Sequence, residues 1–159
     1  MIDLQINPNT YNKTVEVLDY NLKRSNRTFI EVSSYPDSQD QFYQFQEFLE
    51  NNIGINERVQ LAGHNVTKHD SKFIKEWFRD NNEDMYSYFS YDHLDTLHLA
   101  RWARHWGALK GCEDLKLKTL CDYLGVEDFE WHDSLQDIRA TRTMHSRLKE
   151  RVRNLKPCL

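Results

Sequence analysis

The chain has 159 residues, of which 13% are aromatic, and a formal net charge of −4 at pH 7. A chain of this length can bury a core of its own, and its regularly placed aromatic residues exclude a disordered protein. The acidic balance excludes an overall basic field that would draw the protein to nucleic acid. We therefore expect a single domain that spans residues 1–159.

Cysteine usage and hydropathy indicate the compartment. The three cysteines, Cys112, Cys121 and Cys158, form no C-x-x-C pair, which argues against a disulfide framework and against a zinc ribbon. Cys121 falls in an apolar helical pattern and is expected in the core. The sequence shows no apolar run of membrane-spanning length and no signal peptide. We expect a cytoplasmic protein that does not associate with membranes.

The first third of the chain is expected to hold a strand and two helices. Apolar residues alternate over residues 1–8, which predicts a strand, and residues 13–22 have the pattern of a short helix. A loop is expected at residues 33–37. Ser38 followed by Gln41 is a capping-box pattern, which predicts a second helix. Its expected apolar face consists of Phe42, Phe45, Phe48 and Leu49.

A strand followed by a helix forms the middle of the chain. Residues 58–62 are predicted to form a short strand that ends at Gly63-His64-Asn65, and Asp70 or Ser71 can cap the helix that follows. The expected buried face of this helix consists of Phe73, Ile74, Trp77 and Phe78. Asp70 thus comes just after a strand end, where ligand groups gather in open α/β sheets. Simple N-capping is equally compatible with its position.

The second half of the chain is rich in helical patterns. Residues 86–91 are aromatic and expected to be extended. One helix is expected to begin at Leu94-Asp95-Thr96-Leu97, and another covers residues 115–124 with Gly125 at its C-terminal end. A strand–helix alternation followed by helices indicates the α/β class.

The final helix begins within the stretch from His132 to Thr141. Asp133 or Ser134 can cap it, and Asp137 would lie on its first turns. Its expected apolar positions are Leu135, Ile138, Met144, Leu148 and Val152. A rigidly held carboxylate suits a metal ion, and a mobile imidazole suits a general base. A capped amphipathic helix with an incidental histidine is equally compatible.

This helix also carries a run of cations with Glu150 as the single acid. The cations are Arg139, Arg142, Arg147, Lys149, Arg151, Arg153 and Lys156. Such a run can contact phosphates, but a solvated face with cations near a helix C-terminus is the favoured interpretation.

Four segments, in matching order, resemble motifs of the DEDDh 3′-5′ exonucleases, the DnaQ-like group. Gly63-His64-Asn65-Val66 with Asp70 resembles the second motif of this family. The stretch from His132 to Thr141 resembles its third motif, H-x-A-x-x-D-x-x-x-T. Residues 94–97 resemble the "D-T-L" start of a helix, and residues 116–126 resemble the "K-L-x-x-L … L-G-I" segment.

The resemblance implies a ribonuclease H-like fold, with a mixed central sheet flanked by helices. It implies hydrolysis of phosphodiester bonds at single-stranded 3′ ends of DNA or RNA, assisted by two Mg²⁺ or Mn²⁺ ions on carboxylates. Carried over by motif position, Asp70 and Asp137 would be metal ligands, and His132 would take the proton from the attacking water. Asn65 would fix the strand end or lie near the substrate.

Three further residues receive supporting roles from the same comparison. His64 is interpreted as structural, and Asp95 as a helix cap in preference to a metal ligand. Thr141, one turn beyond Asp137, could brace that aspartate through a hydrogen bond.

The first motif of the family, D-x-E on the first strand, has no clean copy here. The nearest candidate is Asp3-Leu4-Gln5, which makes Asp3 a candidate ligand but replaces the glutamate by a neutral amide. Ser134 also replaces the alanine of the third motif. One interpretation is that the fold lacks its first strand. We expect the chain as given to have low or no nuclease activity, and a form extended by a D-x-E strand to be active.

A non-catalytic relative with the same fold is the second hypothesis. It would bind nucleic acid or a protein partner through the cleft and the basic final helix. His132 weighs toward the enzyme, because a scaffold needs no titratable base beside Asp137. A zinc protein is disfavoured, because the histidines do not pair closely with cysteines.

Overall fold

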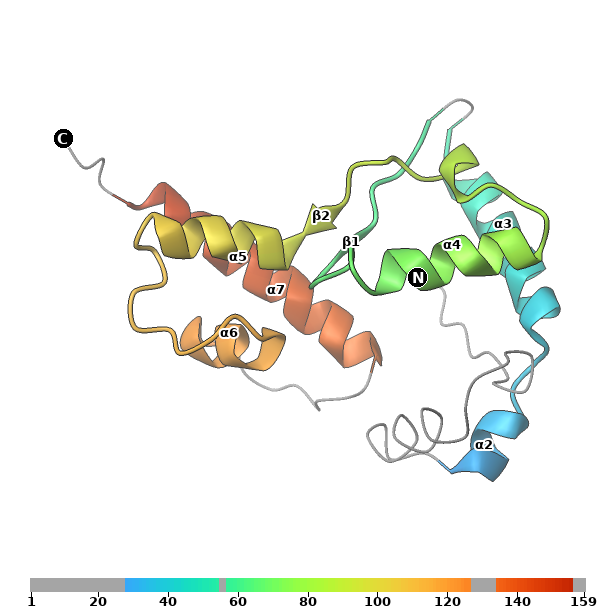
Figure 1. The fold of residues 1–159 in the computed structure, drawn as a ribbon, viewed down its shortest axis with the longest axis horizontal. Coiled ribbons are helices and arrows are strands. Elements are labelled where there is room, and N and C mark those ends of the chain that lie inside the picture. Colours follow the sequence, from blue (N-terminus) through green and yellow to red (C-terminus); the bar gives the residue numbers. More distant parts are fainter. Residues whose placement is uncertain (1–27, 55–56, 127–133, 156–159) are drawn as a thin grey trace. The chain divides into compact units, whose positions relative to one another are not determined.

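The computed structural model describes residues 28–54, 57–126 and 134–155. The predicted strand and helix before residue 28 lie outside the described residues, as do Asp3 and His132. The described chain combines many helices with a short parallel sheet, as the α/β class predicts (Figure 1). None of the helices in these ranges has the length and apolar character of a membrane span.

The described residues group into two compact units, and the boundary between them falls within helix α4 (Asp70–Asp80). The first unit holds the described residues before position 60 together with residues 74–90. The second unit holds residues 60–73 and the described residues from 91 onward. The single domain expected over residues 1–159 stays a prediction.

The first unit contains α2 (Phe29–Ser33), α3 (Ser38–Asn52), most of α4 and the 3₁₀ helix η2 (Met85–Ser87). Its core is aromatic, as the helical spacing predicted. The Phe42 ring meets Trp77 and Phe78 edge to face, with centroids 5.3 and 5.0 Å apart. Edge-to-face pairs add to the stabilisation that burial of the rings provides.

The cap of α3 differs from the prediction. Asp37 is the N-cap, and its carboxylate accepts a hydrogen bond from the Gln39 amide at 2.8 Å. Ser38 lies inside the helix, where its hydroxyl oxygen accepts a hydrogen bond from the Trp77 indole at 2.9 Å. The serine therefore joins two helices of the core instead of capping one.

The extended segment expected at residues 86–91 is also partly wrong. The carboxylate of Asp84 accepts a hydrogen bond from the Tyr86 amide and starts η2, so the chain turns before it extends. Only then does Phe89 form an isolated parallel bridge with Val59. Strand pairing in the predicted strand at residues 58–62 is confined to this bridge and to its last residue.

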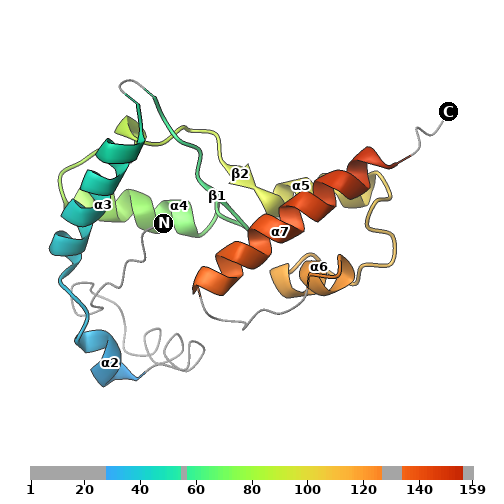
Figure 2. The same cartoon turned by 180° about the vertical axis from the view of Figure 1, so that it is seen from behind.

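The second unit contains a two-stranded parallel sheet of β1 (Ala62–Gly63) and β2 (Leu94–Asp95), in which Gly63 lies opposite Asp95. Three helices accompany it: α5 (Thr96–His105), α6 (Leu117–Tyr123) and α7 (Ser134–Arg153). Helix α7 contacts α5, α6 and β1. Figure 2 shows α7 running across α5, with α6 alongside.

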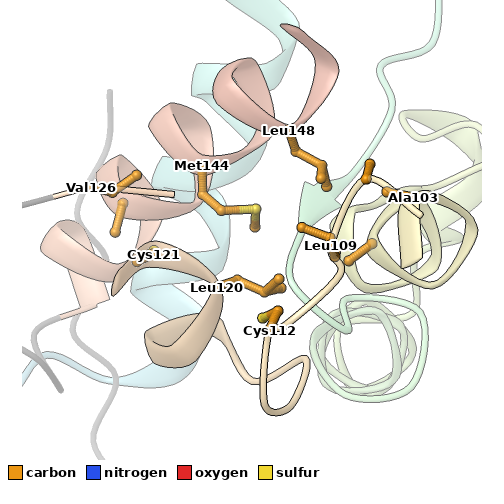
Figure 3. Packing of buried hydrophobic residues seen from close by; sticks show 11 residues of the cluster. Ala103, Leu109, Cys112, Leu120, Cys121, Val126, Met144 and Leu148 are labelled. Atoms are coloured by element: carbon orange, nitrogen blue, oxygen red, sulfur yellow. The ribbon is translucent and has the colours of Figure 1, made fainter. Parts of the chain in front are cut away.

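The core of this unit forms where α5, α6 and α7 meet. Met144 and Leu148 of α7 are fully buried and point toward Leu109 and Leu120 (Figure 3). Cys121 is fully buried as predicted, and burial raises the pKa of its thiol to about 11. A thiol with so high a pKa stays protonated at neutral pH and is a poor nucleophile.

Two apolar residues predicted to be buried are instead exposed. Ile138 of α7 is 61% exposed and Phe73 of α4 is 62% exposed. Each helix turns another residue inward: Ala140 is fully buried, and Ser71 is buried with its hydroxyl donating to the Thr67 carbonyl at 3.0 Å. The other predicted residues largely keep to the buried face, because Met144 and Leu148 of α7 and Trp77 and Phe78 of α4 are buried as predicted.

Two arginines of the basic run in α7 hold the second unit together. Arg147 donates to the carbonyl oxygens of Leu124 and Gly125, which end α6. Arg151 donates to the Ala108 carbonyl at 2.6 Å and to the Tyr123 hydroxyl at 2.9 Å, with its guanidinium 4.9 Å from the Tyr123 ring centroid. Arg139, Arg142, Lys149 and Arg153 are exposed, as the prediction of a solvated face requires.

Replacing Arg151 by alanine is therefore expected to lower the free energy of unfolding by about 1–2 kcal/mol, because two hydrogen bonds and a cation–π contact are lost. Arg153→Ala, which removes an exposed cation from the same helical turn, is expected to have an effect within about 0.5 kcal/mol. Urea unfolding measures both. Equal effects of the two substitutions would contradict the structural role of Arg151.

Candidate functional site

Asp95 is the hub of the segment in which the second-motif residues lie. Its side chain is 5% exposed and accepts hydrogen bonds from the backbone amides of Asn65 at 2.9 Å, Thr67 at 3.2 Å and Leu97 at 3.0 Å. The Leu97 bond caps α5, which confirms the predicted capping role. The other two bonds tie the turn after β1 to the start of α5.

These hydrogen bonds decide the ionisation of Asp95. Burial acts to raise the pKa of the carboxyl, but the hydrogen bonds from Thr67, Leu97 and Asn65 outweigh burial and lower the pKa. Asp95 is therefore ionised at neutral pH. Its two oxygens are engaged with backbone amides, which leaves it poorly suited to bind a metal ion.

His64 joins three segments of the second unit. Its Nε2 lies 3.0 Å from the Leu115 carbonyl oxygen, and its Nδ1 lies 3.0 Å from the Thr96 hydroxyl. Because a carbonyl can only accept, Nε2 must carry the hydrogen. The Thr96 hydroxyl lies between Nδ1 of the neutral ring and the Gly63 carbonyl oxygen, to which it donates at 3.3 Å. The predicted structural role of His64 is confirmed.

Burial lowers the pKa of His64, against the opposing effects of the Leu115 hydrogen bond and the Asp95 charge. A histidine whose folded pKa lies below its unfolded value near 6.5 binds fewer protons in the folded state. Its contribution to stability is thus complete above pH 6.5 and is lost as the pH falls through the folded pKa.

We therefore expect the free energy of unfolding to decline between about pH 7 and pH 5, where histidine titrates, and the His64→Gln variant to lose less stability over the same interval. His105→Gln, at an exposed position of α5, serves as the control and should keep the decline of the unaltered chain. Urea titrations at both pH values measure this. An unchanged decline in His64→Gln would show that other groups cause it.

Asn65 follows β1 in a left-handed backbone conformation, with φ of 64°. Asparagine tolerates this region better than most residues. Its backbone amide is held by Asp95, while the buried Oδ1 of its side chain has no hydrogen-bond partner among the described residues. A buried acceptor without a donor is unusual. The two roles predicted for Asn65, at the strand end or near a substrate, stay predictions.

Asp70 lies in the first turn of α4 and is exposed. The helix begins at Asp70 itself, so Asp70 and Ser71 lie inside its first turn and His69, which can also cap a helix start, precedes it. The amides of Lys68 and His69 donate to the Asn65 carbonyl and close the tight turn between β1 and α4. This turn sets the position of Asp70 relative to β1. The N-terminus of α4 favours the negative charge of the Asp70 carboxylate.

Asp137 lies in the first turn of α7 and is partly buried. The Thr141 hydroxyl donates a hydrogen bond to the main-chain carbonyl oxygen of Asp137 at 2.7 Å. This bond braces the backbone of Asp137. Helix α7 contacts β1, and β1 leads into the turn before Asp70, so the helix that carries Asp137 packs against the strand that precedes Asp70.

These residues do not complete a metal site on their own. Within residues 28–54, 57–126 and 134–155, no three His, Cys, Asp or Glu side chains are grouped so that they could hold a metal ion. Asp3 and His132, which the sequence adds to Asp70 and Asp137, lie outside these ranges. The described residues therefore do not fit a metal pair by themselves.

The first unit has a separate hollow of about 720 Å³. It is lined by Leu49, Glu50, Ile53, Gly54, Glu57, Arg58, Ser87 and Tyr88. Within it the Tyr88 hydroxyl donates to Glu50 at 3.0 Å. None of the predicted site residues takes part in this hollow.

Comparison with models of protein families, with curated proteins and with solved structures finds no match to this chain.

Sequence reasoning did not find the hub role of Asp95 or the exposed tryptophans of α5. The helix-start pattern at residues 94–97 identified the cap, but the two longer-range bonds to Asn65 and Thr67 leave no periodic signal. Trp102 and Trp106 are 59% and 53% exposed, and their four-residue spacing was visible in the sequence. The absence of acidic residues around them was the second signal.

Proposed function

We propose that this chain is a domain of the 3′-5′ exonuclease type, with a ribonuclease H-like fold, that acts on single-stranded 3′ ends of DNA or RNA. Asp70 and Asp137 would be its carboxylate ligands for Mg²⁺ or Mn²⁺, and His132 its general base. The proposal rests on the resemblance of the second and third motifs.

The observation that best supports the proposal is the packing of α7 against β1. It brings the helix that carries Asp137 to the strand that leads into Asp70. Hard cations prefer oxygen ligands, and a parallel strand end beside helix N-termini is a common setting for such sites.

A non-catalytic nucleic-acid-binding or partner-binding domain is the alternative. It is favoured by the lack of a three-residue metal-ligating group within the described residues. Two carboxylates leave half of the charge of two dications uncompensated, so hydrolysis needs ligands beyond Asp70 and Asp137.

The experiment that separates the two functions is a trimming assay on a 5′-labelled single-stranded oligonucleotide with Mn²⁺. An exonuclease gives a ladder of products shortened from the 3′ end. A matched oligonucleotide with phosphorothioate linkages at its 3′ end should resist, and a circular single strand should stay intact. Because the first motif has no clean copy, the chain as given is expected to trim slowly or not at all, and a form extended by a D-x-E strand is expected to trim. Binding of the strand without any shortened product in the extended form as well would contradict the exonuclease and support the alternative.

A further inference from the structure

The outward face of α5 is aromatic and basic. Five exposed residues share it, and we call them the tryptophan face: His98, Arg101, Trp102, His105 and Trp106. Spacings of three and four residues place them on one side of the helix. Ala100 and Ala103, on the opposite side, are fully buried in the core.

The two tryptophans form a continuous aromatic surface. Their ring centroids are 5.7 Å apart with an interplanar angle of 34°, and the His105 ring meets Trp102 edge to face at 6.2 Å. Both indoles keep more than half of their surface exposed. Single exposed apolar residues are ordinary, but adjacent exposed indoles mark an interaction site.

The charge of this region is opposite to that of the chain. No aspartate or glutamate occurs from Thr96 to Cys112, whereas Arg101, Arg104 and Lys110 do, in a chain of net charge −4. Arg104 is engaged with the Cys112 carbonyl at 2.8 Å. Arg101, on the tryptophan face itself, is exposed.

We infer that the tryptophan face binds single-stranded nucleic acid, whose bases stack on Trp102 and Trp106 while a phosphate meets Arg101. Stacking on aromatic side chains combined with cationic contacts to the backbone is how proteins hold single strands without reading their sequence. A duplex would not present its base faces. The inference rests on the proposed function in one respect, namely that the ligand is a nucleic acid and not another polyanion. It requires neither Asp70 nor Asp137.

Binding of fluorescein-labelled oligo(dT) to the full chain, measured by anisotropy with EDTA present, tests this inference. Trp102→Ala is expected to weaken binding about tenfold and the Trp102→Ala/Trp106→Ala double variant about 100-fold, whereas Trp102→Phe should retain most of the affinity. Arg101→Ala should reduce the slope of log affinity against log salt by about 0.7. Tyr43→Ala, which removes a 56% exposed aromatic from α3, should leave binding unchanged.

Several results would overturn the inference. These are no binding of oligo(dT), equal binding by the double variant, and dissociation of a dimer by the double variant with oligonucleotide binding unchanged. Binding of the face to anionic vesicles but not to oligo(dT) would also overturn it. Weaker binding by the double variant, together with no trimming even by a form extended by a D-x-E strand, would support the tryptophan face and count against the proposed exonuclease.

Discussion

Replacing Asp95 by alanine is expected to lower the free energy of unfolding by about 3 kcal/mol, because α5 loses its cap and two further amides lose their acceptor. Those amides belong to Asn65 and Thr67, in the turn between β1 and α4. Asp95→Asn should cost less, since one amide oxygen still accepts. Urea unfolding measures both variants.

The pH dependence of Asp95 gives a second readout. Because its folded pKa is lowered from an unfolded value near 3.8, its contribution is complete above that pH and is lost as the pH falls through the folded pKa. Asp95→Ala should therefore lose less stability on acidification below about pH 4 than the unaltered chain does.

Asp122→Ala, at an exposed position of α6, is the matched control for Asp95→Ala and should cost no more than about 0.5 kcal/mol. If Asp95→Ala proves as mild as this control, Asp95 does not organise the turn.

Replacing Asp137 by asparagine is expected to reduce any Mn²⁺-dependent trimming of single strands by about 100-fold or more, because a neutral amide is a much weaker ligand for a hard dication. The substitution keeps the size of the side chain and leaves the Thr141 bond to the main chain intact. The rate of 3′ shortening at saturating oligonucleotide measures the effect.

The control for Asp137→Asn is Asp122→Asn, which removes the same charge from an exposed site in the same unit. It should trim at the rate of the unaltered chain. Trimming by Asp137→Asn at an undiminished rate would show that any nuclease activity arises elsewhere than at the proposed ligand.

The sequence predicted those features that depend on local chemistry. Asp95 as a cap, His64 as a structural residue and Cys121 as a core residue are confirmed. The roles of Asp95 and Cys121 follow from short patterns, a polar residue at a helix start and an apolar position in a helical repeat, whereas the role of His64 came from the motif resemblance. The short strand ending at Gly63 followed from the same kind of pattern.

Features that depend on packing partners could not be predicted. Ile138 and Phe73 fit the helical repeats as well as Ala140 and Ser71 do, and the choice between them depends on which neighbour each helix meets. The hydrogen bond from the Trp77 indole to the Ser38 hydroxyl joins helices from distant parts of the chain. No local signal records such a contact, so the wrong cap was assigned to α3.

The candidate site was predicted as a set of residues but not as an arrangement. The contact of α7 with β1 supplies the neighbourhood in which Asp70 and Asp137 would act. The roles of Asp3 and His132 stay predictions, because both lie outside the described residues.

A thermal-shift titration with Mn²⁺ tests most directly whether Asp70 and Asp137 share one cation. A ligand that binds the native state raises the melting temperature, by an amount that grows with its concentration. We expect the unaltered chain and Asp122→Asn to show this rise, and both Asp70→Asn and Asp137→Asn to lose it. A rise that survives in either of the last two variants, or no rise in the unaltered chain, would contradict a shared cation site.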